Sequence, residues 1–223
     1  MAAEPQGASK AIVITSFSVT GAPQDFERAF TAHAEFVRAQ PGFNQFQLTK
    51  SVDQPKVYVN VGWWADVDSY LRVVRSQRFG EDLRAMADLV QAEPQVCTKV
   101  TNGNRIQPGG DGQQEVQAYG GERVMVVTHY VSHGDPGAFE HEFAEHTDMR
   151  RQQQGFIFHE AVRSMNNPGT FVNVEWWMGT EAYYAAMEQD RVLTDAARLK
   201  ALADVRTVRA RNIANGEPLV RTG

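Results

Sequence analysis

The sequence predicts an α+β fold made of two copies of one βαββαβ unit. Three observations lead to this prediction. The second half of the chain matches the first at one fixed offset and without a gap. Strand-like and helix-like patterns follow the same order in both copies. The predicted strands are apolar on both faces, so each sheet needs a cover on both sides.

The internal repeat is carried by identical residues at corresponding positions. Phe26 corresponds to Phe139, which sets the offset at 113 residues, and all four tryptophans of the chain fall into matched pairs. Two copies are too few for a solenoid, so the repeat indicates a pseudo-symmetric pair of small domains. The identical pairs include Thr15 and Thr128, Pro23 and Pro136, His33 and His146, Asn60 and Asn173, Trp63 and Trp176, Trp64 and Trp177, and Tyr70 and Tyr183.

Each element of the first copy has a local signal. Residues 11–20 predict a strand, because Ile, Val, Thr and Phe dominate and a Gly-Ala-Pro segment follows. Apolar residues at three- and four-residue steps predict a helix from Phe26 to Val37, which Pro41 and Gly42 end. Strands are predicted at 43–52, 56–64 and 96–106, with a second helical region at 66–92 broken near 78–80. This order is the ferredoxin-like arrangement, in which four antiparallel strands carry two helices.

The second copy repeats this order. Its strands are predicted near 123–132, 156–165, 169–177 and 205–213, and its helices near 136–153 and 180–204. The chain therefore divides into a first repeat at 1–106, a linker at 107–121, which its glycines predict to be flexible, and a second repeat at 122–223. Helices would cover one face of each sheet. The sister sheet would cover the other, by face-to-face packing or by closure into one barrel.

Composition argues against several classes of function. The chain has 22 Lys and Arg against 27 Asp and Glu, a net charge of -5, with no basic run, so neither nucleic acid nor membrane is an expected partner. Its apolar runs are far shorter than the roughly 20 residues that span a bilayer. The first ten residues show no secretory signal, so a cytoplasmic location is expected. The single cysteine, Cys97, excludes an intrachain disulfide and is expected to be a buried, inert thiol.

Several of these motifs together resemble the antibiotic biosynthesis monooxygenase family. They are the first strand with its Thr, the Pro-Gly-Phe start of the second strand, and the Val-Asn-Val-Gly-Trp-Trp strand that leads to a helix with Tyr70. The resemblance covers both repeats and implies the dimeric α+β barrel fold. In most members one unit is a subunit and two subunits make the barrel, so a tandem chain is expected to build its barrel internally.

Within that family the chain is similar to the anthrone oxygenases of aromatic polyketide pathways, which form quinones with O2 and without metal or flavin. Their pocket residues correspond here to Asn60, Trp64, Tyr70 and Arg84, which the resemblance implies as catalytic. In the second repeat Ala197 replaces the arginine, and Arg198 lies about 100° further around the helix. The first repeat is therefore expected to be the main site. The residues expected to bind substrate are Asn173, Trp177, Tyr183, His33 and His146.

These residue types suit oxygen chemistry. A deprotonated phenol or anthrone can pass an electron to O2, so the substrate can replace a cofactor. Asn60 and Trp64 lie four residues apart on one strand face and offer N–H donors to a phenolate oxygen. Arg84 would favour the ionised phenol and Tyr70 could relay a proton. Ordinary packing stays the alternative for the tryptophans and tyrosines, as does a satisfied core position for His33 and His146.

Other chemistry has weaker support. Haem-degrading members of the superfamily bind iron through a histidine of the second helix, and no histidine lies between Ala34 and Thr128 or after His159. His141 and Glu145 are predicted to form a solvated helix face rather than a metal site, and no metal is expected. The adjacent Arg150 and Arg151 are also predicted at the surface. No GxSxG or GxGxxG motif supports a hydrolase or a nucleotide-binding unit.

The sequence therefore predicts a monooxygenase that acts on a hydroxylated polycyclic aromatic, an anthrone- or naphthacenone-like polyketide intermediate. The product is a quinone or a hydroxylated compound, and no tightly bound cofactor is expected. One alternative is a ring-cleaving oxygenase that uses reduced FMN or FAD from a partner reductase. Another is a non-catalytic barrel that binds aromatic ligands. The expected partners are the small aromatic substrate and O2, with a homodimer and a flavin reductase left open.

Overall fold

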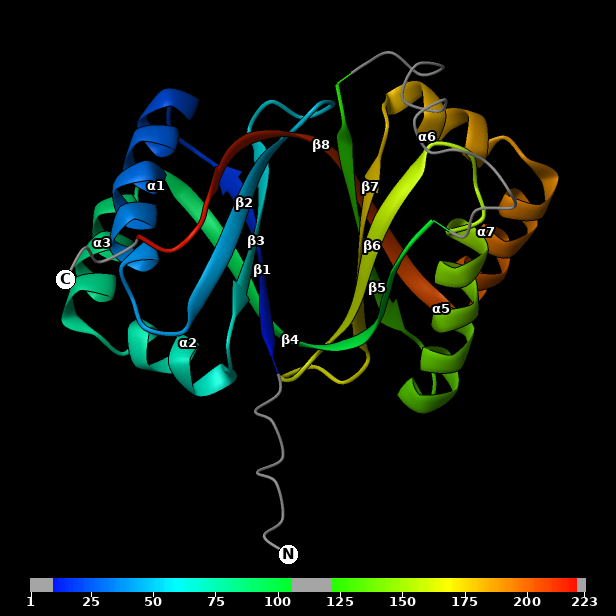
Figure 1. Ribbon diagram of the computed structural model, residues 1–223, viewed down its shortest axis with the longest axis horizontal. Helices are drawn as coiled ribbons and strands as arrows, with labels where there is room; N and C mark the ends of the chain where they lie inside the picture. Colours follow the sequence, from blue (N-terminus) through cyan, green and yellow to red (C-terminus); the bar gives the residue numbers. More distant parts are fainter. Residues whose placement is uncertain (1–9, 106–121, 220–223) are drawn as a thin grey trace, which may run out of the picture. The chain divides into compact units, whose positions relative to one another are not determined.

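The computed structural model describes residues 10–105 and 122–219 (Figure 1). Both repeats fold in the predicted βαββαβ order, with the second helical region of each divided into two helices. The predicted fold class is therefore confirmed. The predicted linker at 107–121 and the first nine residues of the chain lie outside the described residues.

The first repeat differs from the prediction at the break in its second helical region and at the start of its last strand. Its elements are β1 (Ala11–Val19), α1 (Pro23–Arg38), β2 (Phe43–Ser51), β3 (Val57–Trp64), α2 (Val67–Val74), α3 (Gln77–Met86) and β4 (Val90–Asn104). The helix break lies a few residues before the predicted one, because the Ser76 hydroxyl accepts the Phe79 N–H and caps α3. The helix predicted up to residue 92 is too long, since Val90–Pro94 pair with β1 as strand.

The second repeat has the same plan. Its elements are β5 (Val124–Ser132), α5 (Pro136–Arg150), β6 (Phe156–Ser164), β7 (Thr170–Trp177), α6 (Thr180–Met187), α7 (Asp190–Leu202) and β8 (Ala203–Gly216). The prediction of one continuous helix at 180–204 is wrong, because the chain breaks at Glu188 and Gln189 before α7 begins. No Gly or Pro marks this break, and Asp190 in the first turn of α7 suits a helix N-terminus.

Strand pairing brings the repeated motifs into register. In β1 and β3, Thr15 lies opposite Asn60, and in β5 and β7, Thr128 lies opposite Asn173. β1 also pairs with β4, and β5 with β8. Hydrogen-bonded neighbours follow the order β1-β3-β2-β8-β5-β7-β6-β4, which closes on itself. The predicted barrel of antiparallel strands is therefore confirmed.

The chain divides into two compact units that do not follow the repeat boundaries. Unit 1 comprises the described residues up to Leu48, those from Lys56 to Thr98 and those from Ala214 onward. Unit 2 comprises Thr49–Pro55 and the described residues between Lys99 and Ile213. Each unit therefore includes the last part of the other repeat's final strand. In Figure 1, α1 and α3 lie along the strands of unit 1, and α5 and α7 along those of unit 2.

Aromatic side chains build the two cores differently. In unit 1, five rings pack in mutual contact with centroids up to 6.0 Å apart, those of Phe17, Phe26, Phe30, Phe46 and Tyr58. In unit 2, Tyr130 packs with Phe139 and Phe143 in one cluster, and Trp177 packs with Phe156 in another. Cys97 is buried as expected, and burial raises the pKa of its thiol to about 12. It is therefore a packing residue.

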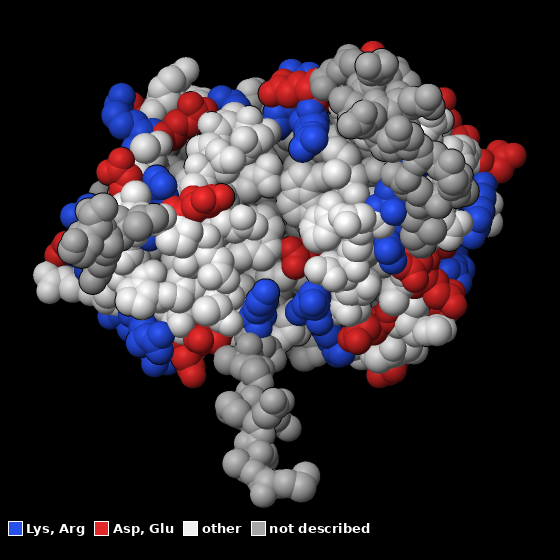
Figure 2. Space-filling view, in the orientation of Figure 1, with Lys and Arg blue, Asp and Glu red and all other residues white. Residues whose placement is uncertain are grey.

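Charged side chains at the surface are mixed in sign. Over the face drawn in Figure 2, Lys and Arg lie interspersed with Asp and Glu, as the near balance of acidic and basic residues predicts. Among the described residues, no helix has both the length and the apolar character needed to cross a membrane.

Candidate functional site

A cavity of about 240 Å³ lies within the second repeat. Side chains from β5, α5, α6, α7 and β8 form its walls. Met187, Val192 and Leu199 are among the apolar residues of the wall, and seven of its thirteen residues are polar. A partly apolar pocket with placed polar groups is typical of a small-molecule site. These polar residues are Thr128, Tyr130, His146, Arg150, Tyr183, Lys200 and Thr207.

A buried ion pair underlies one wall of this cavity. The Arg150 guanidinium binds the Glu175 carboxylate through two hydrogen bonds, Nε to Oε1 at 2.9 Å and Nη2 to Oε2 at 2.7 Å. The two side chains are only 6% and 2% exposed. Burial alone would raise the pKa of Glu175, but the charge and hydrogen bonds of Arg150 lower it below its ordinary value. Both groups are therefore ionised, and the pair has the planar two-bond geometry that arginine favours.

The Glu175 carboxylate also anchors two of the predicted site residues. Asn173 donates from Nδ2 to Oε1 at 2.9 Å, and Trp177 donates from Nε1 to Oε2 at 3.1 Å. His159 contacts the Asn173 Oδ1 through Nδ1 at 3.2 Å, and burial lowers the pKa of this imidazole. Four N–H donors thus surround one buried carboxylate, and its lone pairs are satisfied.

The Arg150 side chain faces aromatic rings as well as its carboxylate partner. Its Cζ lies 5.3 Å from the centroid of the Trp177 ring and 5.5 Å from that of Tyr183. Burial would lower the pKa of Arg150, but the Glu175 charge outweighs it and raises the pKa. Burial also raises the pKa of the Tyr183 phenol. Arg150 is therefore a fixed cation at the cavity wall, held between two π faces.

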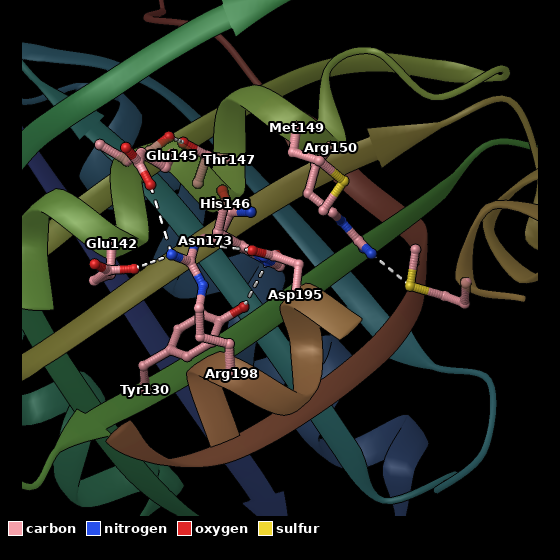
Figure 3. Close-up of polar contacts among 12 residues, drawn as sticks. Tyr130, Glu142, Glu145, His146, Thr147, Met149, Arg150, Asn173, Asp195 and Arg198 are labelled. Carbon is pink, nitrogen blue, oxygen red and sulfur yellow. Dashed lines mark hydrogen bonds and ion pairs between the residues drawn. The ribbon is translucent and has the colours of Figure 1, made fainter. Parts of the chain in front are cut away.

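A second set of hydrogen-bonded side chains reaches the same cavity. His146 Nδ1 contacts the Asp195 carboxylate, and His146 Nε2 lies 3.3 Å from the Tyr130 hydroxyl (Figure 3). A carboxylate only accepts hydrogen bonds, so Nδ1 carries the hydrogen in this contact, and in the neutral imidazole Nε2 is then the acceptor. Burial would raise the pKa of Asp195, but its bonds with His146 and Arg198 lower it. Burial raises the pKa of the Tyr130 phenol, which therefore stays protonated.

The first repeat brings together three of its four predicted catalytic residues. Trp64 is buried and packs edge-on against the Tyr70 ring, with centroids 5.5 Å apart. A Cβ placed on Gly62 would lie 3.5 Å from Trp64 Nε1 and 3.8 Å from Asn60 Nδ2, so both side chains lie over this glycine. The Asn60 Oδ1 is buried without a hydrogen-bond partner among the described residues. Burial raises the pKa of Tyr70.

Arg84, the fourth predicted residue, is not brought to this group. Its side chain is exposed, and its Nε donates to the Gly80 carbonyl of its own helix at 3.1 Å. His33 forms a part-buried contact from Nδ1 to Asp82 Oδ2 at 3.0 Å, and its ring packs edge-on against Phe79. In the first repeat, therefore, the arginine and the histidine do not share a wall with the predicted Asn and Trp.

The second repeat gathers all its predicted residues around the cavity and the ion pair. Tyr183 and His146 line the cavity, while Asn173 and Trp177 bind Glu175. Whether they contact a substrate stays a prediction. Four polar residues of this region were missed: Tyr130, Arg150, Glu175 and Asp195. The interpretation of Arg150 as a surface residue is wrong, since it is 5% exposed.

The repeat offset contained a signal that could have found three of these residues. At the offset of 113, Val37 corresponds to Arg150, Gly62 to Glu175 and Phe17 to Tyr130. The acidic Glu175 replaces a glycine and the basic Arg150 replaces a valine, although the elements that carry them match in the two repeats. Two replacements of opposite charge indicate a pair that acts together. Asp195 corresponds to Asp82, just as His146 corresponds to His33. Both repeats therefore have a His–Asp contact.

Metal ligands are not grouped in the described part of the chain. No set of three His, Cys, Asp or Glu side chains lies close enough there to hold a metal ion. His141 and Glu145 form an exposed contact of 3.4 Å along α5, in line with the predicted solvated face.

Comparisons with known proteins match both repeats. The family model for antibiotic biosynthesis monooxygenases matches residues 11–85 and 123–194. Deoxynogalonate monooxygenase of Streptomyces nogalater is 31% identical over 86 residues, which span 39% of this chain and 73% of that protein. SnoaB, a cofactor-independent oxygenase from the same organism, is 30% identical over 45% of this chain and 99% of its own, with a TM-score of 0.40.

A solved structure extends the likeness over both repeats. An anthrone oxidase-like protein matches with a TM-score of 0.73, covering 95% of this chain and 96% of its own at 13% sequence identity. This likeness shows that the fold of the two repeats together also occurs in another protein.

Proposed function

The chain belongs to the antibiotic biosynthesis monooxygenase family, and from this premise we propose that the cavity of its second repeat oxygenates a hydroxylated polycyclic aromatic. Membership of the family makes the protein a monooxygenase. The proposal concerns the substrate class, the place of the reaction and the absence of a tightly bound cofactor. Its product is a quinone or a hydroxylated aromatic.

The observation that carries the proposal is the buried Arg150–Glu175 pair at the cavity wall. Removing two charges from water is costly, and apolar residues of similar size often serve stability as well or better. The first repeat has Val37 and Gly62 at these positions and folds in the same way. Because the fold does not require the pair, we infer that it has a chemical use.

That use is to stabilise negative charge on the substrate. An anthrone or phenol that loses a proton becomes an enolate or phenolate, and a fixed guanidinium beside its oxygen favours this ion. Glu175 keeps Arg150 in place, and Asn173 and Trp177 in turn hold Glu175. In this repeat the predicted Asn and Trp therefore act as positioning residues for the cation.

The electron-rich anion then supplies the electron that a cofactor supplies in other oxygenases. It passes an electron to O2, the two radicals combine to a peroxide, and loss of water leaves a carbonyl. For an anthrone, one CH2 group and one O2 become one C=O group and one water, so atoms and electrons balance. The apolar walls at Met187, Val192 and Leu199 exclude water from these intermediates. SnoaB, which shares 30% sequence identity with part of this chain, is described as cofactor-independent.

The test is oxygen uptake by the purified protein with anthrone, alone and with FMN or FAD plus a flavin reductase. Uptake above the spontaneous rate without flavin is the expected result. Uptake that needs reduced flavin would instead favour the ring-cleaving alternative. Arg150→Val combined with Glu175→Gly gives the second repeat the residues of the first and leaves no unpaired buried charge. We expect this double variant to lose about a hundredfold or more in turnover.

A charge-matched control accompanies that variant. Arg163→Gln with Glu140→Gln removes a part-exposed ion pair of the same repeat, whose atoms lie 2.8 Å apart. This control is expected to keep its turnover. If the Arg150 and Glu175 double variant kept full turnover while Asn60→Ala and Trp64→Phe abolished it, the active site would lie in the first repeat.

A further inference from the structure

We propose that His146 is the general base of the second-repeat cavity, and that Asp195 positions it and links it to a groove at the surface. This inference rests on the proposed function, because it assigns the group that takes the substrate's proton there. His146 is buried and lines the cavity together with Arg150, and its Nε2 lies 3.3 Å from the hydroxyl of Tyr130, another lining residue.

The hydrogen bonds fix which nitrogen can act. Nδ1 donates to the Asp195 carboxylate, so the lone pair of the neutral imidazole is on Nε2. Without a ligand, the Tyr130 hydroxyl lies 3.3 Å from that nitrogen and is placed to donate to it. A substrate hydroxyl in the cavity would be a competing donor. A histidine whose second nitrogen is held by a carboxylate is the usual arrangement for a general base.

The His–Asp contact also joins two hollows of the second repeat. His146 lines the inner cavity, while Asp195 lines a groove of about 530 Å³ together with Glu145, Met149 and Arg198. The Asp195 side chain is 13% exposed, and Arg198 donates to its Oδ1 at 3.0 Å. Figure 3 draws Tyr130, His146, Asp195 and Arg198 together with the polar contacts among them. A proton taken in the cavity therefore has a hydrogen-bonded route toward the groove.

Charged and titratable groups from the elements around His146 interact with it or line its cavity. They are Tyr130 on β5, Glu175 on β7, Tyr183 on α6, Asp195 and Lys200 on α7, and Arg150 on its own helix. On proton transfer, the electron pair of the broken bond, O–H in a phenol or C–H in an anthrone, stays on the substrate as a phenolate or enolate, and the proton goes to Nε2. The imidazolium then lies opposite the Asp195 carboxylate, and the new oxyanion shares the cavity with Arg150. The peroxide anion then takes this proton back from Nε2. When the O–O bond breaks, the hydrogen left on the same carbon is lost as a proton, and the departing hydroxide combines with it to form water.

A His–Asp contact alone does not make a catalytic site, as the first repeat shows. His33 and Asp82 form the same contact at 3.0 Å. There, Phe17 replaces Tyr130, Val37 replaces Arg150, and Phe79 packs against the His33 ring. His33 is therefore part-buried and packs against an aromatic ring. In the second repeat the same pair faces hydroxyl groups and a cation.

The experiment uses alizarin, a hydroxyanthraquinone whose colour changes when its phenol ionises, and it does not require turnover. Alizarin is titrated from low to high pH in the presence of wild-type protein, His146→Gln and His141→Gln. The exposed His141 is on the same helix and provides the matched control. We expect alizarin bound to wild type and to His141→Gln to ionise at least about one pH unit lower than alizarin bound to His146→Gln.

The possible results of the alizarin titration have different consequences for the two proposals. Equal ionisation of alizarin on wild type and on His146→Gln would overturn the inference and leave the proposed function standing. Ionisation that depends on His146, without oxygen uptake on anthrones, would support the base and overturn the proposed function. Failure of wild type to bind alizarin would overturn both.

A turnover measurement distinguishes a base from a structural residue. For His146→Gln we expect kcat with anthrone to fall about a hundredfold or more at neutral pH, with KM little changed. The loss should shrink as the pH rises and the free substrate ionises by itself. A loss that is constant with pH, or that appears only in KM, would overturn the assignment. Asp195→Asn should show the same pH pattern with a smaller loss, because it acts through His146.

Discussion

Val37 and Arg150 occupy corresponding positions in α1 and α5, and Gly62 and Glu175 correspond in β3 and β7. In the first repeat, the Asn60 and Trp64 side chains lie over a bare glycine, and aromatic rings fill the space beneath α1. In the second, the equivalent Asn and Trp donate to a carboxylate, and a cavity lies beside the arginine. The same backbone plan therefore tolerates both an aromatic interior and an interior with a buried ion pair and a cavity. The chemistry therefore depends on a few side chains rather than on the fold.

The largest effect should come from removing one member of the buried pair. Glu175→Ala leaves the Arg150 charge buried without its partner, so we expect the free energy of unfolding to fall by about 3–5 kcal/mol. Urea denaturation at neutral pH measures this. Asp53→Ala breaks the part-exposed pair with Arg209 and should lower the free energy by only about 0–1 kcal/mol. Similar losses in the two variants would mean that burial of the pair has little energetic weight.

Transfer of the ion pair into the first repeat tests whether that repeat can also hold it. Gly62→Glu alone should destabilise the protein, because it places an unpaired carboxylate at a buried position. Val37→Arg together with Gly62→Glu should recover part of that loss, with a coupling free energy of about 1–3 kcal/mol in a double-mutant cycle. Strictly additive effects would show that the first repeat cannot bring the two groups together.

The matched tryptophans test which repeat is active. Trp177→Phe removes a donor to the buried Glu175, so we expect it to lower the free energy of unfolding by about 1–3 kcal/mol and to lower oxygen uptake. Trp64→Phe changes a packing contact with Phe43 and Tyr70 and should cost about 1 kcal/mol or less, with a smaller loss of uptake. The reverse order of the two losses of uptake would favour the first repeat as the main site.

Tyr130→Phe, which introduces the residue found at position 17 of the first repeat, should also have only a small effect. It removes one hydroxyl and its contact with His146, so the free energy of unfolding should fall by about 1 kcal/mol. Oxygen uptake should persist, because Nε2 then faces the substrate alone. Complete loss of uptake would instead make the Tyr130 hydroxyl part of the proton path.

Local patterns were sufficient for most of the fold. The Gly-Ala-Pro stop after β1 and the three- and four-residue steps from Phe26 to Val37 predicted elements that the structure confirms within a few residues. Two boundaries failed for a shared reason. Val90–Pro94 continue a helix-like pattern but become strand by pairing with β1, and Ala203 begins a strand by pairing with β5. Such pairing involves partners far away in the chain, which a local pattern does not contain.

The candidate site was likewise predictable from the sequence only in part. The duplication, the βαββαβ order and the group of Asn, Trp and Tyr in each copy were predictable, because these depend on local spacing and on a fixed offset. The folded chain was needed to show that Arg150 turns inward while the adjacent Arg151 contacts Asn104 and Asp148. Adjacent helix residues differ by about 100° in direction, and the residue that recruits Arg150 is on β7. A buried charge takes the position in which a distant partner neutralises it, and that distance in sequence is closed only by folding.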